Sequence, residues 1–150
     1  MNLIIIALAL FVAYLTIITI TYGWLPSISQ SFYELKKNRL AFVFTLFLFS
    51  LSMLIIFIAK RPMMLAAGFC IIGVSIFPYF LKQKWQHYLC ALFGLGLGMV
   101  SLVVDFNQII VVLIGIFTTV LLYALKVKNL FYWIEVTLFL TIIVGLWMKS

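Results

Sequence analysis

The chain has 150 residues, of which 67% are hydrophobic and 9% are charged, with a formal net charge of +7. A water-soluble domain needs about a quarter charged residues, so this composition excludes one. The ten Lys and Arg residues form no continuous basic stripe that could follow a phosphate backbone, so no nucleic-acid partner is expected. With a mean hydropathy of +1.33, the sequence predicts an integral membrane protein whose surface faces lipid.

The first predicted element is an apolar helix over residues 3–22. No Lys or Arg precedes this segment, and it is longer than the apolar part of a typical signal peptide. No small-x-small cleavage site stands out at its end. We therefore expect a retained first membrane span rather than a cleaved signal peptide.

Five further windows, each 20 residues long, are nearly or wholly free of charge: 40–59, 62–81, 85–104, 106–125 and 129–148. Twenty residues of helix rise ~30 Å, which matches the hydrocarbon core of a bilayer. The apolar runs are continuous and lack the period-two alternation of a membrane β-strand. We predict one all-α domain over residues 1–150, a polytopic bundle of six transmembrane helices at about 3–22, 40–59, 62–81, 86–104, 107–125 and 130–148.

The short connections predict that consecutive spans are antiparallel neighbours, and only Gly23–Arg39 is a long loop. With six spans, the connections after the first, third and fifth lie on one side of the membrane. That side carries seven basic residues, Lys36, Lys37, Arg39, Lys82, Lys84, Lys126 and Lys128, and the other carries Lys60, Arg61 and Lys149. This imbalance predicts that the first group is cytoplasmic and that both termini lie outside.

Because consecutive spans alternate in direction, several polar residues lie on the side of the membrane that carries the first loop. If the protein has a ligand or catalytic site, we expect it on this face, whereas Asp105 belongs to the opposite one. The candidate site residues are Ser27, Ser29, Gln30, Ser31, Glu34, Tyr79, His87 and Glu135.

Glu135 is the one acid placed inside an apolar window, in the sequence LFYWIEVTLFL. It lies ~8 Å of helix rise past the start of the sixth span, too deep for a short side chain to reach water easily. One interpretation is a proton or cation ligand or a catalytic carboxylate. The other is a structural partner for Lys126, Lys128 or a donor on a neighbouring helix, or a span that begins later.

His87 is the only histidine and lies near the start of the fourth span. Its imidazole could act as an acid–base group, or it could belong to an interfacial belt with Trp85 and Tyr88. One His, two Cys and three acids without metal-ligand spacing do not predict a metal site, and no cofactor is predicted.

Small residues recur along the fourth span at spacings of three, four and three: Ala91, Gly94, Gly98 and Ser101. Such a stripe lets two helix backbones approach closely in a membrane. It predicts either packing within the chain or dimerisation. Leu95 lies off the stripe, so its truncation is expected to be milder than enlargement of a stripe glycine.

Two short stretches carry a family resemblance. They are Pro26-Ser27-Ile28-Ser29-Gln30-Ser31-Phe32-Tyr33 after the first span and His87-Tyr88-Leu89-Cys90-Ala91-Leu92-Phe93 at the start of the fourth. Both resemble motifs of small six-span proteins related to the DRAM (damage-regulated autophagy modulator) and Frag-type group. Gln30 stands where that pattern has Asp. The resemblance implies a six-span architecture with the first loop outside the cytosol, opposite to the orientation that the basic residues predict.

Three classes of function remain open. The first is a non-enzymatic component of the cell membrane, in particular a bacterial inner membrane, that binds a membrane protein or a second copy of itself or organises lipids. The second is a small transporter or lipid carrier that uses Glu135 and His87. The third is a membrane-embedded hydrolase of lipid headgroups that uses the same two residues and a loop serine.

Overall fold

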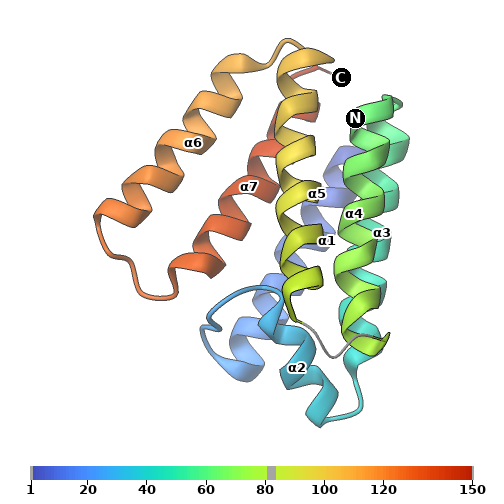
Figure 1. The fold of residues 1–150 in the computed structure, drawn as a ribbon, viewed down its shortest axis with the longest axis vertical. Coiled ribbons are helices and arrows are strands. Elements are labelled where there is room, and N and C mark those ends of the chain that lie inside the picture. The colour runs from blue at the N-terminus through green and yellow to red at the C-terminus, as the bar shows by residue number, and fades with distance from the viewer. Residues whose placement is uncertain (1, 81–83, 150) are drawn as a thin grey trace.

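The computed structural model describes residues 2–80 and 84–149, and the side chains of residues 3–76 and 88–149. Within these ranges the chain is all-helical, with seven helices and no strand. The helices are α1 (Asn2–Tyr22), α2 (Gln30–Lys37), α3 (Ala41–Ala59), α4 (Pro62–Phe80), α5 (Lys84–Val104), α6 (Ile109–Ala124) and α7 (Leu130–Trp147) (Figure 1).

The six long helices begin and end within two residues of the ranges predicted from the sequence. The extra helix is α2, which occupies part of the predicted Gly23–Arg39 loop, so the prediction of a loop there is wrong for Gln30–Lys37. This short helix is amphipathic, because it buries Phe32 and Leu35 on one face. Its last turn carries Lys36 and Lys37, where positive charge is favourable at a helix C-terminus.

Three helical segments are long and apolar enough to cross a membrane: Leu3–Tyr22, Ala41–Ala59 and Leu130–Trp147. The described parts of the other long helices provide shorter apolar stretches, Pro62–Ile76, Tyr88–Val104 and Ile109–Ala124. Hydroxyl groups inside the helices donate to carbonyls of the preceding turn, as Ser52 does to Leu48 O at 2.7 Å. This local bonding lets serine occupy an apolar helix without an unsatisfied polar group.

Left-handed residues end the helices at their connections. Lys60 has φ 51°, and its backbone N–H donates to Ile56 O, which closes the last turn of α3. A left-handed residue after the last turn stops a helix and redirects the chain. The described residues with positive φ are Gly23, Arg39, Lys60, Asn107, Lys126 and Asn129. Basic residues between the apolar windows therefore also form the turns.

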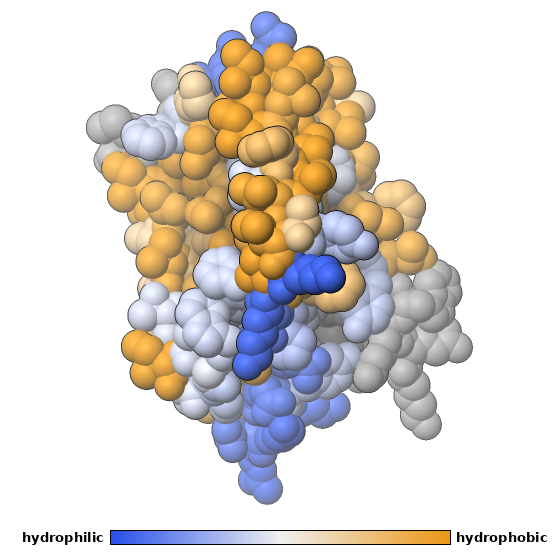
Figure 2. Space-filling model, turned by 90° about the vertical axis from the view of Figure 1, so that its left-hand side faces the viewer, coloured by the Kyte–Doolittle hydropathy of each residue, from blue (hydrophilic) through white to orange (hydrophobic). Residues whose placement is uncertain are grey.

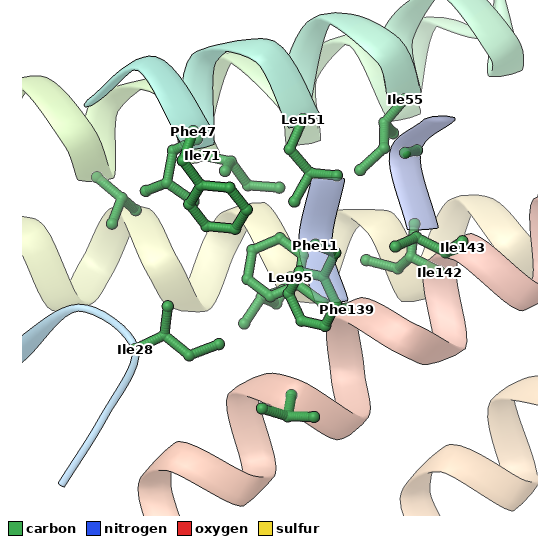
Figure 3. Packing of buried hydrophobic residues seen from close by; sticks show 14 of the residues in the cluster. Phe11, Ile28, Phe47, Leu51, Ile55, Ile71, Leu95, Phe139, Ile142 and Ile143 are labelled. Atoms are coloured by element: carbon green, nitrogen blue, oxygen red, sulfur yellow. The ribbon is translucent and has the colours of Figure 1, made fainter. Parts of the chain in front are cut away.

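The core lies among α1, α3, α4, α5 and α7, with α4 packed between α3 and α5 and with α7 in contact with α1, α3, α5 and α6. Aromatic rings fill its centre: Phe11 lies 5.5 Å from Phe139, and Tyr14 stacks on Phe47 with ring centroids 3.8 Å apart. Figure 3 shows Phe11, Phe47 and Phe139 converging from helices that are distant in sequence. Both termini lie at the end of the bundle opposite α2 (Figure 1).

Helix α6 lies at the edge of the bundle and packs on α7 and α5 (Figure 1). It buries only Val111, Val112 and Gly115, while large apolar side chains cover its other faces. Figure 2 shows this side of the molecule as a hydrophobic column above a hydrophilic end. An exposed apolar surface of this extent marks contact with lipid or with another protein.

Candidate functional site

The chain re-enters the bundle after α1 along residues 24–29, which we call the re-entrant segment. Its backbone bonds to α7 at alternate residues: Asn129 Nδ2 donates to Trp24 O (3.1 Å), Tyr132 N to Pro26 O (3.0 Å) and Ile28 N to Glu135 Oε2 (2.5 Å). The α7 partners are three residues apart, so they lie on one helix face. From residue 129 to 135 the helix rises ~9 Å, so the segment reaches well past the start of α7.

Ile28 is the apolar tip of the re-entrant segment. Its side chain is 4% exposed and points into the core near Leu95 and Phe139 (Figure 3). Ile28 is thus a packing residue, as is Leu25 of the same segment, which is 7% exposed. Their burial helps to hold the segment inside the bundle.

The Glu135 carboxylate accepts hydrogen bonds from the re-entrant segment. Besides the N–H of Ile28, the backbone N–H and the hydroxyl of Ser29 donate to it. Ser29 is the N-cap residue of α2, where the helix presents partial positive charge. A buried carboxylate needs such donors, and buried non-helical backbone N–H groups need acceptors. Glu135 therefore acts as a structural acceptor, and its partner is the first loop rather than Lys126 or Lys128.

The loop serines bond within the segment and to α1. Ser27 Oγ lies 3.0 Å from Ser29 Oγ and accepts the N–H of Gln30 at 3.1 Å. Ser31 is fully buried, donates to Ile28 O at 2.5 Å and lies 2.6 Å from the Tyr14 hydroxyl. The Ser27 hydroxyl thus accepts the first backbone N–H of α2, and the Ser31 hydroxyl ties this helix to the core through Tyr14.

A small cavity of about 20 Å³ adjoins Glu135 and Ser29, and its other walls come from α3, α4 and α5. This volume holds about one water molecule, whereas ligand pockets measure roughly 300–1,000 Å³. The walls of the cavity are almost wholly apolar, and in this conformation it is too small for a lipid headgroup.

The other candidate residues lie elsewhere or outside the described side chains. Glu34 pairs with Lys37 Nζ at 2.6 Å on the outer face of α2, away from the cavity. Gln30 is half-buried at the start of the same helix. The side chains of Tyr79 and His87 lie outside the described residues, so their predicted proximity to Glu135 stays a prediction. Among the described residues, no three His, Cys, Asp or Glu side chains form a metal-binding group.

The small-residue stripe of α5 faces other helices of the same chain. A Cβ at Gly94 would lie 2.8 Å from Ile71 Cγ1 on α4, and one at Gly98 would lie 2.6 Å from Ile142 Cδ1 on α7. Ala91 is half-buried beside the cavity, and the buried Ser101 donates to Asp105 Oδ2 at 2.6 Å.

Leu95 requires a correction. It is 7% exposed and lines the cavity, so its truncation would remove core packing and is not the mild change expected from its position off the stripe.

Sequence reasoning missed Tyr14, which holds the start of α2 through Ser31, and Asn129, which holds the re-entrant segment from the start of α7. A signal for α2 was present: Ile28, Phe32 and Leu35 are spaced by four and three, and all three are buried. That spacing is typical of a helix face.

Comparisons with known proteins give no match to a protein family, to a curated protein or to a solved structure.

Proposed function

We propose that the protein is a six-span component of the cell membrane, in particular of a bacterial inner membrane, that organises lipids or binds a membrane partner. The observation that carries this proposal is the engagement of Glu135, Ser29 and Ser31 in holding the re-entrant segment. These groups are the buried acid and two buried hydroxyls among the described candidate residues, and the cavity beside them has the volume of about one water. In contrast to this small cavity, the apolar exterior of the helices offers an extensive surface for contact with lipid or a membrane partner.

Six spans are supported by the apolar stretches of α4, α5 and α6 together with the three longer segments. Basic residues cluster at helix ends, where they can contact anionic headgroups and water. Membership of the DRAM and Frag-type group remains part of this proposal, supported by the loop motif and the six-span pattern.

A second candidate is a transporter or carrier that uses Glu135. The observation in its favour is the water-sized cavity beside a buried carboxylate, because intramembrane acids commonly mark proton or ion pathways. Transport would require the re-entrant segment to withdraw from α7. A hydrolase finds less support, since the hydroxyls of Ser29 and Ser31 are buried and hydrogen-bonded.

Native mass spectrometry of the detergent-solubilised protein, with activity assays in liposomes, tests the proposal. We expect a retained phospholipid or a stoichiometric membrane subunit, with no headgroup release from mixed lipids. Proton or cation flux that is lost in Glu135→Gln and kept in Glu34→Gln would replace the proposal by transport. Headgroup release abolished by Glu135→Gln would replace it by hydrolysis.

A further inference from the structure

An open groove lies between the C-terminal half of α1 and the N-terminal half of α7. Its two hollows, of about 290 and about 360 Å³, are both lined by Trp24 and Trp133. The two indole rings lie 5.1 Å apart and form the boundary between the hollows. We call this feature, with its inner and outer hollows, the aromatic groove.

The inner hollow is apolar. Its walls include Leu15 and Ile20 of α1 and Val136 of α7. The hydroxyl of Thr19 on this wall lies 3.4 Å from that of Tyr132, so these polar atoms face one another. A hollow of this kind suits a hydrocarbon chain, which gains nothing from polar contacts.

The outer hollow is polar and basic. It is lined by Val127, Lys128 and Asn129 at the turn between α6 and α7. The Lys128 ammonium makes no ion pair within the described part of the chain, and Lys126 is exposed on the same turn. Figure 2 shows hydrophilic residues gathered at this end of the molecule, below the hydrophobic column.

We propose that the aromatic groove binds an anionic diacyl phospholipid, with an acyl chain in the inner hollow and the phosphate beside Lys128. The order of groups along the groove, apolar wall, indole rings and then ammonium, matches the order of acyl chain, interface and headgroup in a lipid. The volumes are close to the lower bound of ligand sites, roughly 300 Å³. This inference rests on the proposed function because it requires the protein to lie in a bilayer.

The selectivity for anionic lipid comes from Lys128, the lysine that lines the outer hollow. A Lys at the membrane surface favours anionic lipid by about fivefold. Packing of an apolar partner helix in the groove would not use the charge of Lys128. A second copy of the same turn would bring like charges together. The unpaired ammonium therefore favours a phospholipid as the occupant.

Tryptophan fluorescence quenching tests the proposal in the full-length protein in liposomes. A reporter variant, Trp85→Phe with Trp147→Phe, keeps Trp24 and Trp133. Phosphatidylglycerol and phosphatidylcholine, each brominated near the glycerol end of the acyl chain, are compared at equal mole fraction. We expect an apparent affinity about fivefold higher for the brominated phosphatidylglycerol, reduced to parity by Lys128→Gln.

Lys149→Gln is the matched control, because Lys149 is an exposed lysine at the opposite end of the helix bundle. It should leave the preference of the reporter unchanged. Equal quenching by both lipids in the unmodified reporter would overturn the groove proposal and leave the membrane placement intact. A second reporter variant keeps only Trp147. If neither lipid quenches Trp24 and Trp133 while Trp147 is still quenched, protein fills the groove, and this result would also overturn the groove proposal. No quenching in either reporter would contradict the proposed function itself.

Discussion

Ile28 and Glu135, separated by 107 residues in sequence, are joined by a hydrogen bond from the Ile28 backbone N–H to Glu135 Oε2 at 2.5 Å. The bond satisfies two buried polar groups at once. A carboxylate inside an apolar helix gains a donor, and an irregular backbone inside a bundle gains an acceptor. The acid that the sequence singles out is therefore explained by the path of the first loop.

Glu135→Gln should destabilise the protein. The amide keeps one acceptor oxygen, but it loses the charge and brings N–H groups toward the donors of Ile28 and Ser29. Hydrogen bonds to charged groups contribute about 1.5–3 kcal/mol, so we expect a loss of that order in the free energy of unfolding. Thermal unfolding in detergent measures it.

Glu34→Gln serves as the control for this change, because it removes a carboxylate from a surface pair with Lys37. Surface ion pairs contribute little, so its unfolding midpoint should stay at the wild-type value. Equal midpoints for Glu135→Gln and wild type would show that the Ile28–Glu135 bond is not needed for folding.

Tyr14→Phe should weaken the attachment of α2 to the core. The change removes the hydroxyl that lies 2.6 Å from Ser31 Oγ and keeps the ring stacked on Phe47. We expect a loss of about 0.5–1.5 kcal/mol in the free energy of unfolding, measured by denaturant titration in detergent micelles. Tyr123→Phe, at a residue 71% exposed on α6, should have no effect, and a similar loss there would contradict the assignment.

How much of this structure the sequence predicts depends on whether the interactions are local or join residues distant in sequence. The long helices are readable because the apolar windows and the basic residues between them are local features. The depth of Glu135 is readable for the same reason. Its partner is not, since the bond to Ile28 depends on how α1 and α7 pack, and a single sequence contains no local sign of that contact. The polar composition of the first loop also concealed the spacing of Phe32 and Leu35 that marks α2.

The glycines of α5 provide a matched comparison along one helix. Gly98→Leu introduces a side chain where a Cβ already lies 2.6 Å from Ile142 Cδ1, and Gly94→Leu does so 3.2 Å from the backbone N of Ile71. Overpacking typically costs ~1–3 kcal/mol, so both variants should unfold at lower temperature. Gly96 has nothing within 4 Å of its Cβ position, so Gly96→Leu should be neutral or slightly stabilising. An equal decrease of the unfolding temperature in all three variants would show that the effect comes from the helix backbone and not from contacts with neighbouring helices.

The seven-to-three imbalance of Lys and Arg predicts that α2 is cytoplasmic and that the C-terminus lies outside. Cysteine labelling from outside intact cells tests this orientation, after the free Cys70 and Cys90 are replaced by alanine. Asn38 and Met148 are suitable positions, because both are exposed and neither carries charge, so the imbalance is preserved. We expect Met148→Cys to react with a membrane-impermeant maleimide and Asn38→Cys to react only after permeabilisation. The reverse pattern would favour the orientation that the resemblance to the DRAM and Frag-type group implies, and it would move the Lys128 end of the aromatic groove to the outer leaflet.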